Sequence, residues 1–249
     1  LPLLRCRITV KKSNQDQELS YIQTDSRKIQ DGDIFCVSES FGEKTKGFIE
    51  DALARKAKAI LFKKDSGFIK FAENFEIIME SENDPDELVG FLASALKNNP
   101  SKDLKIIAVT GTNGKTSVTH ILSDLLEKEN LKCGIIGTIK TKYADVLIET
   151  GYTTPDAPFL HSILDDMRNK GIEFVLMEAS SHGLKLGRLN GTDIYASIFT
   201  NLTVDHLDFH ESMDDYRKSK LKIFQLLNKS IHKNKFALIN LNFPGGDEI

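Results

Sequence analysis

The stretch VTGTNGKTS at 109–117 most constrains what this chain can fold into. It follows the apolar run IIAV at 106–109, which has the composition of a buried strand, and precedes a segment with helical periodicity. In that setting the N–H groups of the turn and of the helix N-terminus converge on a phosphate. Gly111 and Gly114 let the backbone approach phosphate oxygens where a side chain would clash. The stretch therefore predicts a phosphate-binding loop.

Two polar residues of this loop have separate expected roles. Lys115 would reach the terminal phosphates of a nucleotide, and the Thr116 hydroxyl would ligate magnesium. The loop departs from the general Walker A pattern, because Val109 stands where that pattern has its first glycine. GKT alone could be a chance surface turn, but the strand, the helix and the two glycines favour nucleotide binding. The predicted ATP-binding residues are Thr110, Gly111, Thr112, Asn113, Gly114, Lys115, Thr116 and Ser117.

Apolar runs and helical segments alternate on both sides of a breaker cluster at 98–101. Beyond this cluster, strands buried on both faces alternate with helices, which indicates a doubly wound, mostly parallel sheet. The fold class is therefore α/β: a small α/β N-terminal domain at 1–99, then a phosphate-loop ATPase domain at 100–249.

Besides a helix with an apolar stripe at 48–58, four helices are predicted with defined ends or faces. One begins at Pro85 after an Asp84 cap; another follows the phosphate loop; the others span 157–170, closed by Gly171, and 213–228. Helical spacing predicts the buried faces of the first two. These faces are Leu88, Phe91, Leu92, Ala95 and Leu96 in the first helix, and Val118, Ile121, Leu122, Leu125 and Leu126 in the second.

The composition excludes several classes of protein. With 33 basic and 36 acidic residues the net charge is −3, which gives no reason to expect nucleic-acid or anionic-membrane binding through bulk electrostatics. No apolar run approaches the roughly 20 residues of a membrane span, and no secretory signal opens the chain. Cys6, Cys36 and Cys133 match neither a disulfide framework nor a metal site, so we expect reduced thiols. A cytoplasmic protein follows.

Acidic and histidine residues follow the later strands. Glu178 ends the strand FVLME, where a sheet ATPase needs a carboxylate for magnesium, although a solvated strand end is the usual position of a glutamate. The segment TNLTVDHLDFH at 200–210 contains two of the six histidines together with Asp205 and Asp208. A zinc site is the alternative there, but no cysteine or H-E-x-x-H spacing supports it.

Lys220 is anomalous within the helix predicted at 213–228. It falls near the middle of the apolar arc formed by Met213, Tyr216, Ile223, Phe224 and Leu227. A lysine there is costly unless it extends to solvent, pairs, or changes its chemistry. Desolvation lowers the pKa of an amine, and a neutral amine can react with carbon dioxide to give an anionic carbamate. Periodicity alone leaves extension to solvent open as the simpler alternative.

Together these segments resemble the Mur ligase family, and in particular its MurE branch, over nearly the whole chain. TGTNGKT is the form that Mur ligases share with folylpolyglutamate synthetases. DSR at 25–27, GDIF after it and the loop at 42–47 look like the family's N-terminal uridine-nucleotide domain. TTPDA at 153–157 and MEASSHGL at 177–184 are typical of the MurE branch rather than of its relatives.

The resemblance implies roles for individual residues. The substrate-binding residues would be Thr24 and Ser26 at the uridine, and Thr153, Thr154, Ser180 and Arg188 at the muramoyl-dipeptide. His206 would support a second magnesium ion, and Lys220 falls on the lysine that is carbamylated in the family. The implied catalytic residues are Lys115, Glu178, His206 and carbamylated Lys220, and the implied metal ligands are Thr116, Glu178, His206 and Lys220. Leu186 replaces a glutamine that contacts substrate in some members.

The implied function is that of an ATP-dependent amide ligase of cytoplasmic peptidoglycan synthesis. ATP would phosphorylate the D-glutamate γ-carboxylate of UDP-N-acetylmuramoyl-L-alanyl-D-glutamate, and the amine of a diamino acid would attack the acyl phosphate. The implied cofactors are ATP and Mg²⁺, and the expected partners are these substrates, with no nucleic acid, no membrane insertion and a monomeric state. The resemblance also implies that the second domain is incomplete and that a C-terminal domain is missing. A chain ending at Ile249 is therefore not expected to complete ligation by itself.

Three alternatives remain open. A folylpolyglutamate synthetase shares the phosphate loop, but TTPDA and the DSR-headed domain count against it. A non-catalytic nucleotide-binding or scaffold protein is compatible with a missing third domain. A simple phosphate-loop kinase or motor ATPase would turn over nucleotide without any UDP-sugar.

Overall fold

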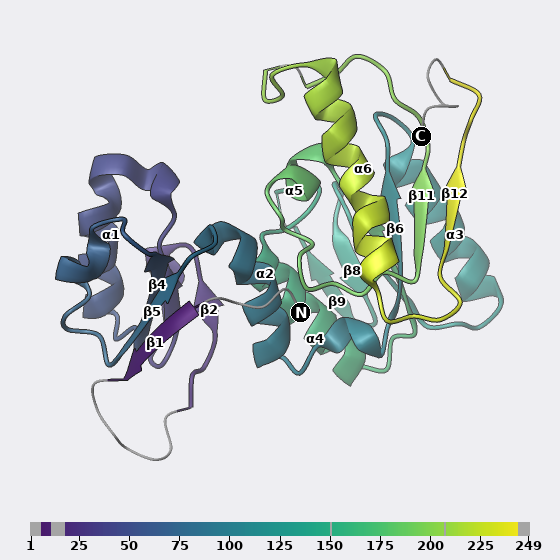
Figure 1. Ribbon diagram of the computed structural model, residues 1–249. Coiled ribbons are helices and arrows are strands. Elements are labelled where there is room, and N and C mark those ends of the chain that lie inside the picture. Colours follow the sequence, from purple (N-terminus) through teal and green to yellow (C-terminus); the bar gives the residue numbers. More distant parts are fainter. Residues whose placement is uncertain (1–5, 11–17, 150, 207, 244–249) are drawn as a thin grey trace. The chain divides into compact units, whose positions relative to one another are not determined.

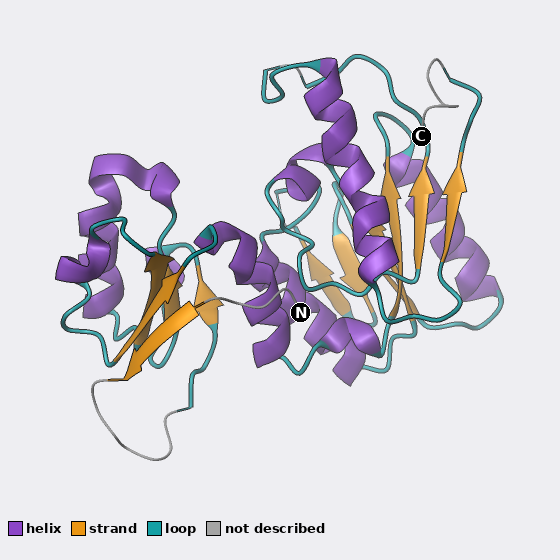
Figure 2. Cartoon of the chain, in the orientation of Figure 1, coloured by secondary structure: helices purple, strands orange, loops and turns teal. Residues whose placement is uncertain are grey.

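The computed structural model describes residues 6–10, 18–149, 151–206 and 208–243. The chain forms two compact units, Leu1–Leu96 and Lys97–Ile249. Each unit is built on its own sheet (Figures 1 and 2). The predicted α/β class is confirmed.

The first unit has a sheet of five strands in the order β1-β5-β4-β3-β2. Its central strands β3, β4 and β5 are parallel, and β1 pairs antiparallel with β5. The elements of this unit are β1 (Cys6–Val10), β2 (Ile22–Gln23), β3 (Ile34–Cys36), α1 (Thr45–Ala54), β4 (Ala59–Lys63), β5 (Ile77–Ser81) and α2 (Pro85–Leu96), with 3₁₀ turns at Ser26–Lys28, Glu39–Lys44 and Phe68–Phe71. One apolar core, which includes Phe35, Ile49, Ile60 and Phe75, joins α1 to this sheet.

The second unit has a seven-stranded sheet in the order β12-β11-β6-β10-β7-β8-β9. The strands from β12 to β7 are parallel, and β8 and β9 form an antiparallel edge. The elements are β6 (Lys105–Thr110), α3 (Lys115–Lys128), β7 (Cys133–Ile136), β8 (Thr141–Tyr143), β9 (Val146–Ile148), α4 (Ala157–Asn169), β10 (Phe174–Glu178), α5 (Ser181–Lys185), β11 (Ala196–Phe199), α6 (Met213–Lys229) and β12 (Phe236–Ile239), with a 3₁₀ turn at Pro100–Lys102.

Strand order explains where the loops of the second unit meet. β6 lies between β11 and β10, and all three strands run parallel. The segments that follow them, starting at Gly111, Ala179 and Thr200, therefore leave the same edge of the sheet. Helices cover both faces (Figures 1 and 2). The main core contains residues of α4 and α6 but none of α3, which packs on β10 and β7 from the other face.

The predicted faces of two helices are partly wrong. In α3 the fully buried side chains are Thr119 and Ser123, whereas Ile121 and Leu125 are 58% and 53% exposed. Small hydroxyl residues let this helix pack closely, because Thr119 donates to the Thr116 carbonyl at 2.9 Å and Ser123 contacts the Cys133 thiol at 3.3 Å. In α2 the buried apolar residues are Leu88, Val89 and Ala93, because a neighbouring arc of the helix is also apolar.

The helix ends agree better with the sequence. Asp156 caps α4 by accepting the Phe159 N–H at 2.9 Å, and Gly171 follows the helix with φ 70°. Ser212 caps α6 by accepting the Asp215 N–H at 3.1 Å. The antiparallel pair β8–β9 and the short helix α5 are not among the predicted elements.

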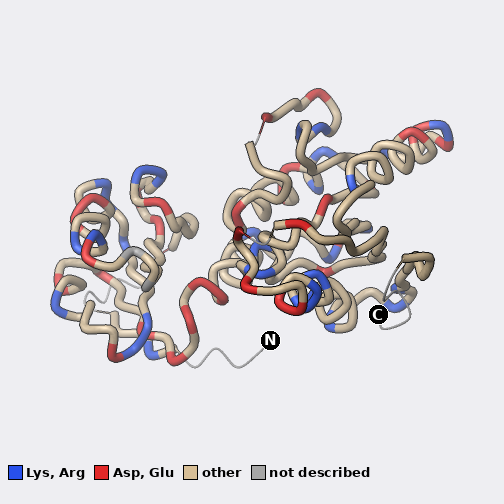
Figure 3. Tube along the Cα trace, turned by 90° about the horizontal axis from the view of Figure 1, so that it is seen from above, with Lys and Arg blue, Asp and Glu red and all other residues tan. Residues whose placement is uncertain are grey.

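The described residues contain no helix long and apolar enough to cross a bilayer. The three cysteines are free thiols; Cys36 is buried, and burial raises its pKa well above the usual value. Acidic and basic residues alternate along both units (Figure 3), in keeping with the net charge of −3.

Candidate active site

The phosphate loop connects β6 to α3 as predicted. Gly114 caps α3 with φ 85°, and Gly111 has φ 141°. Any Cβ on Gly111 would collide with the Thr200 hydroxyl. Both glycines therefore satisfy conformational and steric demands of the turn. Thr110 ends β6 and is buried, Thr112 is nearly buried, and Ser117 is exposed in the first turn of α3.

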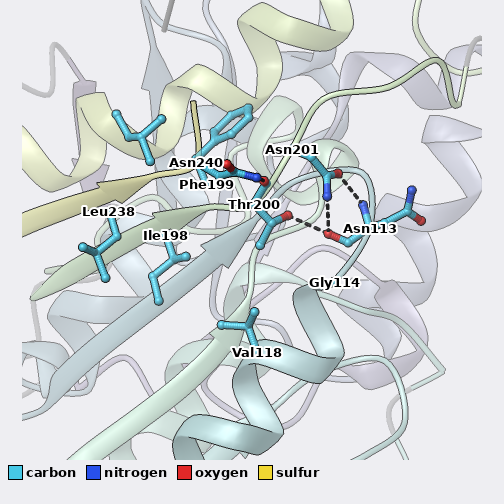
Figure 4. Close-up of a pocket in the computed structure, with 10 residues that line it drawn as sticks. Asn113, Gly114, Val118, Ile198, Phe199, Thr200, Asn201, Leu238 and Asn240 are labelled. Atoms are coloured by element: carbon cyan, nitrogen blue, oxygen red, sulfur yellow. Dashed lines mark hydrogen bonds between the residues drawn. The ribbon is translucent and has the colours of Figure 1, made fainter. Parts of the chain in front are cut away.

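The loop is fixed to the segment that follows β11. The Asn113 N–H donates to Asn201 Oδ1 at 2.9 Å, and the Thr200 hydroxyl donates to the Asn113 carbonyl at 2.6 Å (Figure 4). The Thr112 hydroxyl lies 3.2 Å from the Thr203 carbonyl. These bonds fix the position of the loop relative to the segment after β11.

Lys115 folds back over its own loop. Its Nζ donates to the carbonyls of Gly111 and Thr112, both at 2.9 Å. Burial lowers the pKa of Lys115, while the charges of Glu178 and Asp205 act in the opposite direction. The amine thus lies within the electrostatic field of both carboxylates.

Glu178 is 1% exposed at the end of β10, although a glutamate is normally solvated. Its Oε1 accepts the Thr116 hydroxyl at 2.9 Å and the Thr138 N–H at 3.1 Å, and its Oε2 accepts the Thr138 hydroxyl at 2.9 Å. Gly137 provides the space, because a Cβ there would collide with Oε1. The structure thus brings Thr116 and Glu178 together as the sequence predicts.

The Thr116–Glu178 pair fits a magnesium ion. Mg²⁺ prefers oxygen donors and is usually held by one or two carboxylates, waters and substrate phosphates, not by a dedicated protein cage. Consistent with this, the described residues contain no group of three or more His, Cys, Asp or Glu that could hold a metal. A zinc cluster at 200–210 therefore receives no support from the described part of that segment.

Lys220 is buried in the middle of α6, at 1% exposure. Its Nζ donates to the Gly111 carbonyl at 2.8 Å and lies 4.4 Å from the centre of the Tyr216 ring. Burial lowers its pKa to about 7, with repulsion from Lys115 as a further cause and attraction to Asp205 opposing. The simpler alternative, a lysine extended to solvent, is wrong.

His206 is half-exposed, with φ 51°, and its Nε2 lies 3.5 Å from Asp205 Oδ2. Its ring stands edge-on to His182 at 5.1 Å. Among the contacts of the described residues, none joins His206 to Thr116, Glu178 or Lys220. The structure therefore places three of the four predicted metal ligands around the phosphate loop and leaves His206 at the surface beside it.

The four residues predicted to bind the muramoyl-dipeptide form one cluster beside Glu178. The Thr154 hydroxyl lies 2.8 Å from the Glu178 carbonyl and accepts the Ser180 N–H at 3.0 Å. Arg188 Nη1 donates to the Thr154 carbonyl at 2.7 Å, and the Thr153 hydroxyl lies 3.0 Å from the Thr138 hydroxyl.

The two residues predicted to contact a uridine, Thr24 and Ser26, lie in the first unit. Thr24 is half-buried in the bend after β2, and Ser26 is buried at the start of a 3₁₀ turn. The Ser26 hydroxyl hydrogen-bonds Asp51 and, as the largest cause, lowers the pKa of that carboxyl. Leu186, which replaces a glutamine of some family members, is 50% exposed.

A pocket of about 450 Å³ opens between the N-terminus of α3 and the ends of β11 and β12 (Figure 4). Asn113, Thr200, Asn201 and Asn240 supply its polar groups, and the Asn240 amide donates to the Thr200 carbonyl at 2.9 Å. Its apolar walls are Val118, Ile198, Phe199, Leu238 and Ile239. The pocket adjoins the phosphate loop on the side opposite β10 and its Glu178.

Several residues of the site have no separate prediction from the sequence. Thr138 bonds both oxygens of Glu178, and Asn201 fixes the loop. Thr138 and Asn201 are the last residues of CGIIGT and IYASIFTN, which the sequence predicts as strands, so their place at the carboxyl edge of the sheet is a usable signal. Tyr216 and His210 gave weaker signals, since an aromatic residue on an apolar stripe or a histidine in a loop has many structural roles.

The second unit has the features of a nucleotide-binding phosphate-loop domain. These features are the mostly parallel sheet, the loop after β6, the buried Glu178 at the end of the neighbouring strand β10, and the adjoining pocket. Comparison with known proteins narrows the class. Residues 109–248 match the Mur ligase middle domain. The chain belongs to the Mur ligase family.

The relatives share one description. The chain is 50% identical over 242 residues to the UDP-N-acetylmuramoyl-L-alanyl-D-glutamate–2,6-diaminopimelate ligase of Leptospira interrogans, covering 96% of this chain and 47% of that protein. It is 37% identical to the ligase of the same name from Clostridium perfringens, over 96% of this chain and 47% of that protein. The chain thus spans about half the length of the curated relatives it matches.

Solved structures agree. A structure of a UDP-N-acetylmuramoyl-L-alanyl-D-glutamate–2,6-diaminopimelate ligase superposes with a TM-score of 0.75 at 34% identity, covering 92% of this chain and 45% of that one. A MurF ligase of Thermotoga maritima in complex with ADP shares the fold, with a TM-score of 0.52 at 20% identity, over 90% of this chain and 46% of that one.

Proposed function

We propose that this chain is part of an ATP-dependent ligase that joins a diamino acid to UDP-N-acetylmuramoyl-L-alanyl-D-glutamate, as the names of its relatives say of them. One observation carries the proposal. The Glu178 side chain accepts from Thr116 of the phosphate loop, and its carbonyl accepts from Thr154 of the TTPDA segment. A single residue therefore joins the two parts of the site that phosphoryl transfer must bring together.

The nucleotide phosphates would lie over the loop. N–H groups at the start of α3 and the Lys115 amine supply positive charge, and binding would draw Lys115 from the Gly111 and Thr112 carbonyls toward the phosphates. The adjoining pocket of about 450 Å³ has apolar walls and amide groups suited to a nucleoside. We assign this pocket to the nucleoside of ATP.

Magnesium would be held by Thr116 and Glu178, where it would neutralise charge on the phosphates. A second ion would be supported by His206 and carbamylated Lys220. Lys220 is prepared for this modification, because a pKa near 7 leaves much of the buried amine neutral. Its position 2.8 Å from the Gly111 carbonyl puts the amine directly behind the loop.

The acceptor substrate would lie against Thr153, Thr154, Ser180 and Arg188. The guanidinium of Arg188, held by the Thr154 carbonyl and by the Tyr152 ring at 5.3 Å, keeps further N–H donors for a carboxylate. Thr24 and Ser26 of the first unit would contact the uridine. We place the reaction in cytoplasmic peptidoglycan synthesis and expect a monomer.

The chemistry requires two transfers. The γ-phosphoryl group of ATP passes to the D-glutamate γ-carboxylate, releasing ADP. The amine of the diamino acid then attacks the acyl phosphate and releases inorganic phosphate. The side chains of this site act by position and charge, and none is required as a covalent nucleophile.

The test is ADP release by the whole protein, measured with each substrate withheld in turn. The proposal predicts turnover only when UDP-N-acetylmuramoyl-L-alanyl-D-glutamate and a diamino acid are both present. ATP turnover that ignores the UDP-sugar would instead indicate a simple phosphate-loop ATPase, and turnover with a folate substrate a folylpolyglutamate synthetase.

A further inference from the structure

His210 occupies a buried position between α5 and α6 that the reaction does not require. The residue is 1% exposed. Its Nε2 lies 3.0 Å from the Ser181 hydroxyl, at the start of α5, and its Nδ1 lies 3.1 Å from Asp215 Oδ2, in the first turn of α6. Because a carboxylate only accepts, Nδ1 carries the proton and Nε2 accepts from Ser181. Both ring nitrogens are thus committed to joining two helices.

Asp215 strengthens the same junction. Its Oδ2 also accepts Lys185 Nζ of α5 at 2.6 Å and the Glu211 N–H at 3.3 Å. The side chains of Lys185 and Asp215 are only 30% and 29% exposed. One carboxylate oxygen therefore collects donors from α5, from the preceding loop and from the His210 ring.

The junction continues to the phosphate loop through Tyr216. The Tyr216 ring lies 5.0 Å from the His210 ring, and its hydroxyl lies 3.1 Å from Thr112 Oγ1 of the loop. The Lys220 amine rests on the same ring at 4.4 Å. A shift of the first turn of α6 would move this ring, and with it the surface on which Lys220 lies.

We propose that His210 is a positioning residue that, through Asp215 and Ser181, ties α6 to α5 and so holds Tyr216 and Lys220 against the phosphate loop. The inference rests on the proposed function only for the carbamate on Lys220. The junction also contacts the predicted substrate-binding cluster. Ser181 directly follows Ser180, a member of that cluster, which caps α5 by accepting the Gly183 N–H at 3.1 Å.

Two substitutions test the positioning role of His210 without leaving a large cavity in the core. Ser181→Ala removes the hydroxyl at one end of the junction. Asp215→Asn keeps the shape at the other end but removes the charge shared by His210 and Lys185. The matched control is Asp214→Asn on the same helix, because Asp214 pairs with Lys218 on the exposed face.

Two quantities are measured on the whole protein. The first is the ¹³C NMR signal of the carbamate in ¹³C-bicarbonate, which is assigned by its loss in Lys220→Ala. The second is the affinity for MgADP. We expect the carbamate signal to fall about fivefold in Ser181→Ala and Asp215→Asn, because each change removes one hydrogen-bonding group of the junction that positions Lys220. The signal should be unchanged in Asp214→Asn. Melting temperatures within about 3 °C of one another would show that all variants are folded.

The possible outcomes separate the two proposals. A wild-type signal that persists undiminished in Ser181→Ala and Asp215→Asn overturns the positioning role and leaves the proposed function intact. If the wild-type whole protein binds MgADP but gives no carbamate signal, carbamylation is wrong, and an about fivefold weaker MgADP affinity in the same two variants decides the positioning role. A wild-type whole protein with neither signal nor affinity overturns both.

Discussion

Lys220 is a lysine in the middle of α6 whose side chain is buried against the phosphate loop. Its position on an apolar arc predicts burial, and the structure finds it 1% exposed with its amine on the Gly111 carbonyl. Burial beside Lys115 explains why its pKa falls to about 7. Periodicity marks the anomaly, but only the fold shows that the amine points at the phosphate loop.

At the residue scale, Lys115→Ala should abolish phosphoryl transfer while leaving the fold intact. Lys115 is the cation that bonds two carbonyls of the loop, whereas Lys220 of α6 bonds only the Gly111 carbonyl among the described contacts. We expect turnover of the whole protein to fall at least about a hundredfold, with an unchanged circular-dichroism spectrum. Residual turnover near the wild-type rate would contradict the assigned role.

Lys220→Ala should lose activity and recover part of it with a small carboxylate such as acetate or formate. The truncated side chain leaves a space beside Tyr216 and Gly111 in which an anion could replace the carbamate oxygens. The measurement is turnover against carboxylate concentration, with Lys218→Ala on the exposed side of α6 as control. Absence of any rescue would weigh against the carbamate.

At the level of elements, the buried strands and the helix ends are predictable because they depend on local patterns, whereas the order of the strands in the sheet comes only from the structure. Buried runs, the glycines of the loop and caps such as Asp156 are visible in the sequence. The face of α3 was not, since Thr119 and Ser123 are buried through hydrogen bonds that only the packed structure supplies. The pair β8–β9 was missed because strands of three residues carry too little periodicity.

Only some residues of the site are predictable from the sequence. Lys115, Thr116 and Glu178 belong to patterns that follow strands, and the structure joins them. Thr138 and Asp215, by contrast, act through long-range hydrogen bonds, to Glu178 and to Lys185, that no spacing rule reveals.

His161 in α4 should make the stability of the second unit depend on pH. It is fully buried, its Nε2 lies 2.9 Å from the Asn190 carbonyl, and burial lowers its pKa from 6.5 to about 4. The unfolded chain therefore binds more protons between these values, so stability falls as pH falls through this window, by about 3 kcal/mol.

Urea unfolding at several pH values measures this dependence. His161→Leu should remove the difference between pH 6.5 and pH 4 that His161 contributes, whereas His120→Leu in α3 should keep it. An identical pH profile for His161→Leu and the wild-type chain would contradict the prediction.

At the scale of the whole molecule, the two units have separate sheets and separate cores. The core of the first unit closes around Phe35, Ile60 and Phe62 without any residue beyond Leu96. We therefore expect a polypeptide of residues 1–96 to fold alone and to give a mixed α/β circular-dichroism spectrum with a cooperative melt. A spectrum of unfolded chain would refute that independence.

Under the proposed function, the whole protein activates a carboxylate as an acyl phosphate. The direct measurement uses UDP-N-acetylmuramoyl-L-alanyl-D-glutamate carrying ¹⁸O in the γ-carboxylate, with ATP, Mg²⁺ and a diamino acid. Since the bridging oxygen leaves with the phosphoryl group, the proposed function predicts one ¹⁸O atom in each inorganic phosphate formed. Product formation with no ¹⁸O in the phosphate would contradict it.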